Sequence, residues 1–141
     1  MGSTYVARKG ADAVVANLTV DSLTVNSGGG IVGGQHRHAV QELTATGAIT
    51  ITSGLVKLNH ASTIIAATLA APTEGAELYI VDSSASGTAA HTVTTAAGVT
   101  WDGTNNTATL NAPGEALHVI ALSATRWFIL ENIGSVALSS V

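Results

Sequence analysis

The chain has 141 residues, a formal net charge of −4, and only 10% charged residues. This length predicts one domain with room for an ordered arm or tail. The acidic balance argues against nucleic-acid binding, which needs clustered Lys and Arg to displace the counterions of phosphates.

The chain contains no cysteine, which excludes disulfide bonds, thiolate zinc sites and a cysteine nucleophile. No apolar stretch reaches the length of a membrane span, and the first residues lack an apolar signal core. Hydrophobic residues make up 46% of the chain, but many are alanine, so we expect a thin core. We expect a protein made in the cytoplasm, with no membrane partner.

Residues 1 to about 34 predict an N-terminal arm. Residues 1–17 carry two basic side chains and fit either an extended arm or a frayed short helix. A Leu-Thr-Val triplet then occurs twice, at 18–20 and 23–25, and its β-branched residues favour strands. The candidate binding residues of this arm are Arg8, Lys9, Leu18, Val20, Leu23 and Val25.

A glycine-rich stretch at 26–35 predicts a flexible joint, because glycine leaves the backbone most free. We therefore divide the chain into an arm, 1–34, and a compact body, 35–141. The alternative is a loop between two strands of one domain.

From Val40 onward, short β-prone runs alternate with turn residues. Proline and glycine mark turns at 72–75, 102–103 and 113–114. This pattern predicts an all-β fold, an antiparallel β-sandwich or barrel of jelly-roll type. For 61–71, a short helix ending before Pro72 is the alternative to a strand. We expect strands at 42–46, 48–52, 55–58, 63–67, 76–81, 91–95, 99–101, 107–110, 115–122 and 126–130.

Three of these runs, 76–81, 116–122 and 127–130, are apolar at odd and even positions alike. Side chains alternate between the two faces of a strand, so both faces of the resulting sheet favour burial. The chain offers no amphipathic helix to cover the second face. The sequence therefore predicts a subunit of a larger assembly.

His36 and His38 lie two residues apart, so in a strand both imidazoles point to the same face. Around a threefold axis, three copies would bring together six imidazoles, enough for an octahedral transition-metal site. Gln35-His36-Arg37-His38 resembles a His-x-His pattern of trimeric phage tail fibres. The alternative is a pair of solvent-exposed histidines.

Catalysis finds little support in the sequence. His91 and His118, with Asp82, Asp102 and many serines, supply the residue types of a Ser-His-Asp triad, but geometry defines a triad. The chain has no nucleophile elbow, no phosphate-binding glycine loop and no zinc-protease helix. We expect no enzyme activity and no cofactor.

Trp101 and Trp127 each allow two interpretations. Trp101 precedes a polar loop, 102–106, which together with the indole would suit a sugar ligand. Trp127 lies within a continuous apolar run and is expected in the core. Core or interface packing is the main expectation for both side chains.

Two segments near the end, VTWDGTNNTATLNAPGEAL at 99–117 and SATRWFILEN at 123–132, resemble small structural proteins of tailed bacteriophages, of the head-decoration or cement type. The resemblance implies a β-rich homotrimer that binds the major capsid protein on the outer surface of the virion, after synthesis in the host cytoplasm. The alternative is a trimeric tail-fibre, spike or baseplate component that recognises a host surface.

If the resemblance holds, the apolar strands supply the trimer interface, and each copy presents one arm. An arm that adds a strand to a neighbouring sheet edge would gain main-chain hydrogen bonds, and three arms would act together. The expected interface residues are Leu78, Ile80, Leu117, Val119, Trp127 and Ile129.

Overall fold

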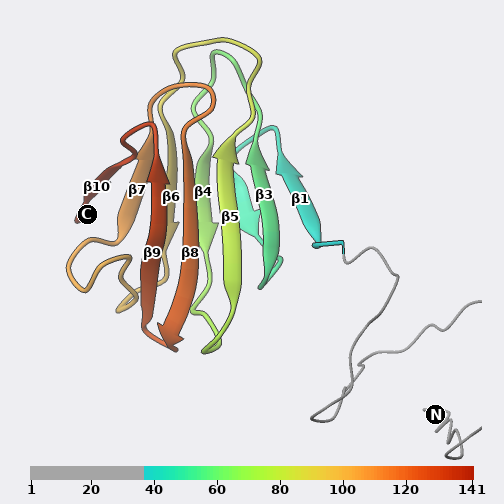
Figure 1. Cartoon of the computed structure of the whole chain (residues 1–141). Helices are drawn as coiled ribbons and strands as arrows, with labels where there is room; N and C mark the ends of the chain where they lie inside the picture. Colours follow the sequence, from blue (N-terminus) through green and yellow to red (C-terminus); the bar gives the residue numbers. More distant parts are fainter. Residues whose placement is uncertain (1–36) are drawn as a thin grey trace, which may run out of the picture. The chain divides into compact units, whose positions relative to one another are not determined.

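The computed structural model describes residues 37–141, which form ten β-strands and no helix (Figure 1). The predicted all-β class is confirmed. The helix alternative for 61–71 is wrong, because this stretch holds a loop and a strand. Among the described residues, no helix could cross a membrane. The strands are β1 (Val40–Leu43), β2 (Gly47–Ile49), β3 (Gly54–Leu58), β4 (Ala66–Leu69), β5 (Glu77–Asp82), β6 (His91–Thr95), β7 (Thr107–Leu110), β8 (Ala116–Ser123), β9 (Arg126–Ile133) and β10 (Ala137–Ser139).

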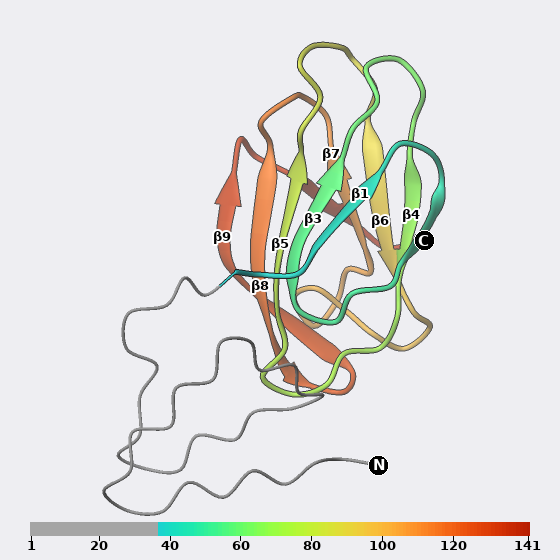
Figure 2. The ribbon, with the colours of Figure 1, turned by 90° about the vertical axis from the view of Figure 1, so that its right-hand side faces the viewer.

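The strands form two five-stranded sheets that face each other (Figure 2). Sheet A has the order β1-β3-β5-β8-β9, and sheet B the order β10-β7-β6-β4-β2. Both sheets are mixed. In sheet A, β1, β3 and β5 pair in parallel, as do β2, β4 and β6 in sheet B. The remaining pairs in each sheet are antiparallel. The expected antiparallel jelly-roll pairing is therefore wrong. The barrel alternative is wrong too, because both sheets stay open.

The parallel pairing follows from the path of the chain. From β1 to β6, each strand crosses to the opposite sheet, so strand pairs stack like three turns of a solenoid. Only from β7 onward do neighbouring strands run antiparallel. The segments 44–46 and 50–53 connect the two sheets, although the sequence predicted strands that extend to residues 46 and 52.

The core lies between the sheets and is built from inward-facing Val, Ile and Leu side chains and two indoles. Trp101 and Trp127 are both fully buried, with ring centroids 6.3 Å apart. The expectation that both indoles pack in the interior is confirmed.

The expected trimer interface requires a correction. Five of its six side chains lie inside the core of their own chain, at 0–1% exposure, and the sixth, Ile129, is partly buried against that core. A side chain with no area left in water gains nothing from a neighbouring copy. Five side chains are therefore assigned to the core of a single chain and not to an interface: Leu78, Ile80, Leu117, Val119 and Trp127.

Two irregularities interrupt the pairing of β8 with β9. Ala121 pairs with Trp127, but Ser123 pairs with Arg126, which leaves Leu122 without an opposite residue. Val119 pairs with Ile129 and His118 pairs with Glu131, which leaves Leu130 without an opposite residue. Bulges of this kind redirect side chains. Both unpaired residues are exposed leucines.

Gly54 allows β1 to approach β3 closely. Its φ is +128°, and an added Cβ would lie 2.3 Å from the backbone oxygen of Ala39. Gly98 also has a positive φ, +77°, but a Cβ there meets nothing within 4 Å.

We expect Gly54→Ala to lower the free energy of unfolding by more than Gly98→Ala, whose cost is limited to about 1–2 kcal/mol of backbone strain. Denaturant unfolding of both variants measures the difference, and equal losses would contradict the close approach.

Candidate interaction surface

The outer face of sheet A forms a regular grid of side chains. The strand registers align Val40, Leu55, Tyr79, His118 and Glu131 in one row across all five strands. These residues alternate with the inward-facing core residues, so they point away from sheet B. This row connects an apolar end on β1 to an acidic end on β9.

The two flanking rows continue the grid. On one side, Glu42 and Lys57 form an ion pair of 2.8 Å near the β1 edge. The hydrogen bond from Lys57 holds the pKa of Glu42 below its usual range. On the other side, Ile120 of β8 lies opposite Phe128 of β9. The face is thus charged near one corner and apolar along β8 and β9.

Most of the large exposed apolar side chains of the described residues gather on this face. Seven such side chains exist in residues 37–141, and two of them, Ile64 and Val141, lie outside sheet A. Four of the five side chains on sheet A belong to β8 and β9, and a group of exposed apolar side chains of this kind marks a site of interaction with another macromolecule. The five on sheet A are Val40, Leu122, Phe128, Leu130 and Ile133.

A polar cluster occupies the centre of the same face. The ring of Tyr79 stacks on that of His118, with centroids 4.1 Å apart and an interplanar angle of 11°. His118 Nε2 lies 2.5 Å from Glu77 Oε1, and this hydrogen bond lowers the pKa of Glu77. Desolvation raises the pKa of Tyr79, with the nearby charge of Glu77 as a smaller contribution. His118 is therefore a partly buried surface histidine with a structural partner.

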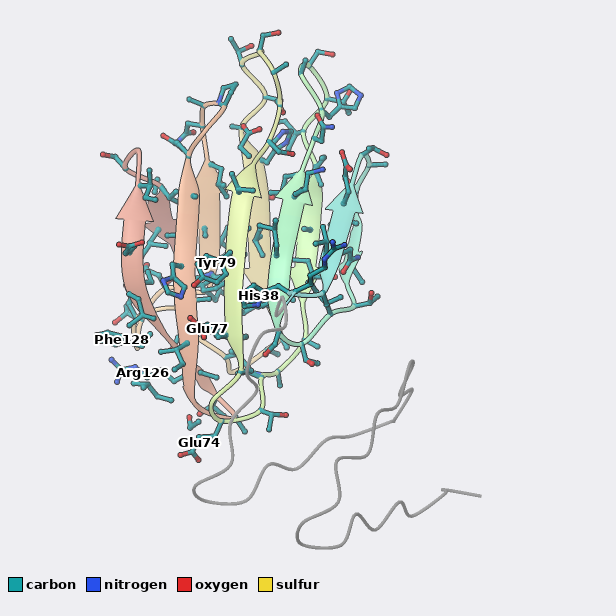
Figure 3. The ribbon with its side chains drawn as sticks, turned by 45° about the vertical axis from the view of Figure 1, so that its right-hand side comes forward. His38, Glu74, Glu77, Tyr79, Arg126 and Phe128 are labelled. Carbon is teal, nitrogen blue, oxygen red and sulfur yellow. The ribbon has the colours of Figure 1, made fainter. Side chains whose placement is uncertain are left out.

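A shallow hollow lies next to this cluster, on the β1 side. Arg37, His38, Val40, Leu55 and Tyr79 line it, and the ring of His38 tilts toward that of Tyr79 at 5.8 Å. Figure 3 shows His38, Tyr79 and Glu77 on one face of the sheet, with Phe128 farther along toward β9. The hollow is mainly apolar at its base and carries a cation at its rim.

This geometry does not test the predicted metal site. His36 lies outside the described residues, and His38 lies beside Tyr79. Within 37–141, no three His, Cys, Asp or Glu side chains come together as a metal site. The pairing of His36 with His38 across copies stays a prediction.

The outer face of sheet B is different in character. Its outward positions hold small side chains, among them Ala48, Thr68, Thr92, Thr94 and Thr109. None of the large exposed apolar residues described above belongs to it. The two outer faces of the sandwich are therefore unequal, and only that of sheet A is strongly apolar.

The residues of the hypothetical triad do not form a catalytic site. His91 and Asp82 are buried between the sheets, with Nε2 and Oδ1 3.8 Å apart. His91 Nδ1 accepts a hydrogen bond from the backbone N–H of Ile65, so this nitrogen carries no proton. His118 lies on the outer face of sheet A, and Asp102 lies in the loop between β6 and β7. A substrate has no access to the buried pair.

The polar loop after Trp101 satisfies its own hydrogen bonds. Asp102 Oδ1 accepts from the backbone N–H groups of Thr104 and Asn105, and these bonds help to lower the pKa of Asp102. Asn106 binds both backbone groups of Val141, which fixes the loop to the chain end. Because the indole of Trp101 is buried, the sugar-stacking interpretation is wrong.

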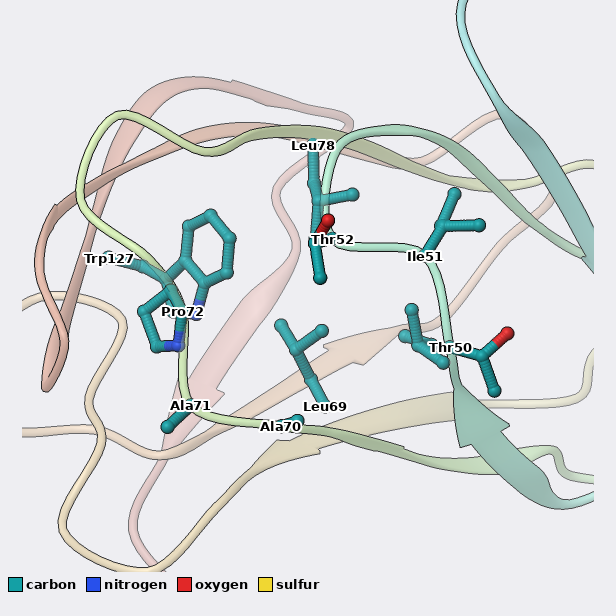
Figure 4. Close-up of a pocket in the computed structure, with 10 residues that line it drawn as sticks. Thr50, Ile51, Thr52, Leu69, Ala70, Ala71, Pro72, Leu78 and Trp127 are labelled. Carbon is teal, nitrogen blue, oxygen red and sulfur yellow. The ribbon is translucent and has the colours of Figure 1, made fainter. Parts of the chain in front are cut away.

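One pocket opens at an end of the sandwich, between the loops that follow β2 and β4 (Figure 4). Its apolar lining includes Leu69, Pro72, Leu78 and Trp127. Its space of about 40 Å³ fits only a few water molecules. Ligand pockets are roughly ten times larger, so this opening is not a candidate ligand site.

No protein-family model, curated protein or solved structure matches this chain. The functional argument therefore depends on the surface itself. Sequence reasoning identified the two-sided apolar strands but assigned the inward positions to the interface. The outward positions Tyr79, Ile120 and Phe128 were missed, although they alternate with the named residues.

His91 provides a test of the buried pair. Replacing it with leucine leaves the Ile65 N–H without an acceptor, and an unsatisfied buried donor costs about 1–3 kcal/mol. We expect His91→Leu to lower the free energy of unfolding by this amount in denaturant titrations. Thr92→Val, on the outer face beside it, is the control and should change stability by under about 0.5 kcal/mol. Equal effects would contradict the assigned role.

Asp102 provides a test at acidic pH. Its pKa lies below the ordinary value of 3.8 in the folded chain, so its stabilisation is complete above that pH and is lost as the pH falls through the folded pKa. We expect Asp102→Ala to lower stability at neutral pH by about 1 kcal/mol, with the gap to wild type closing below pH 3.8. Thermal unfolding across pH measures this gap. A gap that stays constant in acid would contradict it, and Asp102→Asn, which keeps a neutral acceptor, is the control.

Proposed function

We propose that this protein is a structural component of a tailed-bacteriophage virion, a homotrimeric capsid decoration or cement protein that binds and stabilises the outer capsid surface. Two considerations support the proposal. The segments 99–117 and 123–132 resemble head-decoration proteins. The outer face of sheet A leaves large apolar side chains in water, and this single observation carries the argument for assembly.

The energetics of that face favour extensive contact. Complete burial of one large apolar side chain contributes about 1.5–3 kcal/mol, and these side chains are already half-buried. Association costs at least about 4 kcal/mol in lost translational and rotational freedom. One or two side chains are therefore too few to hold copies together. In the proposed trimer each copy has two neighbours, so most of the face can be covered.

The contact with the capsid is assigned to the arm, residues 1–34. The arm lies outside the described residues, so this part of the proposal depends on the sequence. Three arms on one trimer bind with higher avidity than one arm, because the second and third contacts are intramolecular. The proposed partner is the major capsid protein. The proposed contacts are Arg8, Lys9, Leu18, Val20, Leu23 and Val25.

The assembly is tested by native mass measurement. We expect wild-type protein to be trimeric, and the double variant Phe128→Ser/Leu130→Ser to be a folded monomer, because both side chains are about half exposed in the single chain. Ile64→Ser is the control and should stay trimeric, since Ile64 is even more exposed, at 54%, but lies outside sheet A. A wild-type protein that stays monomeric at high concentration, or a double variant that remains trimeric, would contradict the proposal.

The arm is tested by its deletion. We expect a protein lacking residues 1–34 to remain trimeric but to lose co-sedimentation with purified capsids. Unchanged capsid binding would eliminate the arm as the contact. Imaging of particles that carry labelled protein tests the location: decoration predicts many copies across the head, whereas a few copies at the tail would favour a fibre, spike or baseplate component.

A further inference from the structure

We propose that the side chain of Gln41 closes the free edge of sheet B, so that a strand of another chain cannot add to β2. β2 is the edge strand of this sheet, and within the described residues β4 is the only strand that pairs with it. No described strand binds the backbone groups on its other side, which we call the β2 edge. The inference concerns this edge alone and does not depend on the proposed homotrimer.

The composition of the β2 edge favours extension by another chain. The segment 47–52 reads Gly-Ala-Ile-Thr-Ile-Thr, with no charged residue and no proline. Between Glu42 and Lys57 the chain carries no charge at all. Uncharged, β-prone segments of this length at an open sheet edge are sites of strand addition and aggregation. The usual protection of an edge by charges or proline is therefore missing here.

The side-chain amide of Gln41 takes the place of the missing strand. Gln41 lies in β1, at the edge of sheet A, and faces inward like Leu43, which packs against the core. Its Nε2 donates to the backbone oxygen of Ala48 at 2.9 Å, and its Oε1 accepts from the backbone N–H of Thr50 at 2.7 Å. Oε1 also accepts from the hydroxyl of Thr50 at 3.2 Å and from the backbone N–H of Ile51 at 3.3 Å.

These hydrogen bonds imitate the pairing of a parallel strand. In a parallel pair, each residue donates to one neighbour of the residue opposite it and accepts from the other neighbour. Ala48 and Thr50 are the two neighbours of Ile49 in the same way. The partners also fix the orientation of the Gln41 amide, because a carbonyl oxygen only accepts and a backbone N–H only donates. A strand that added here would first have to displace Gln41 from the groups it needs.

Glu42 provides a matched control on the same strand. It follows Gln41 in β1 but points to the opposite face, where it binds Lys57 and Asn59. Replacing Glu42 therefore removes polar contacts from β1 without changing the β2 edge. Comparison of the two positions separates closure of this edge from a general weakening of β1.

Hydrogen exchange of single amides tests the contact. We expect Gln41→Ala to speed the exchange of the Thr50 and Ile51 amides by roughly two- to twelvefold, the factor that corresponds to the net contribution of one hydrogen bond. Glu42→Ala should leave both rates unchanged. Equal rates in wild type and Gln41→Ala would overturn the contact.

Light scattering at increasing protein concentration tests the closure. We expect Gln41→Ala to form larger species than wild type, and Glu42→Ala to keep the wild-type size. The double variant Gln41→Ala/Thr50→Lys should return to the wild-type size, because it places a charge on the reopened edge at an exposed position.

Two outcomes would overturn the closure. One is a Gln41→Ala protein that keeps the wild-type size at every concentration. The other is a double variant that associates as strongly as Gln41→Ala, since association would then follow from lost stability and not from an open edge. Both outcomes are read relative to wild type, so they leave the proposed trimer to its own test.

Discussion

The central constraint on this protein is a sheet that favours burial on both faces. The inner face of sheet A meets sheet B and completes a core around Trp101 and Trp127. The outer face is also apolar along β8 and β9, and no described segment covers it. A single chain satisfies only one of these faces. The hydrophobic effect that stabilises the sandwich therefore also favours association of copies.

The polar features of the surface fit this arrangement. Tyr79, His118 and Glu77 form a stacked, hydrogen-bonded cluster in the middle of the apolar face, so their polar groups already have partners. Such a cluster can be covered by a neighbouring copy at a lower desolvation cost than unpaired polar groups. By contrast, the small threonine and alanine side chains of sheet B give its outer face little apolar area to bury.

The sequence predicted most of the strands but not their arrangement, and the expected strand at 99–101 is only a single β-bridge at Thr100. Local patterns determine where a strand begins and ends, and 91–95 and 107–110 coincide with β6 and β7. Pairing is non-local, and a two-residue turn signal looks the same whether the chain folds back or crosses to another sheet. The last strand, β10, was missed because it is short and follows a turn with positive φ at Gly134 and Ser135.

The same limit explains the candidate interface. A run such as 116–122 is apolar on both faces, so its composition indicates double-sided burial without indicating which face is internal. The structure resolves this point, because registers place Leu117 and Val119 toward sheet B and His118 and Ile120 outward. Catalytic residue types scattered along the sequence likewise carried no information until geometry separated His118 from Asp82.

Hydroxyl-radical footprinting of the native protein at working concentration tests the central claim most directly. Ile64 is 54% exposed outside sheet A and serves as an internal reference for labelling. The account predicts that Phe128 and Leu130 are labelled far less than their exposure in a single copy requires, while Ile64 is labelled fully. Labelling of Phe128 and Leu130 in proportion to Ile64 at every concentration would contradict it, because the outer face of sheet A would then remain in water.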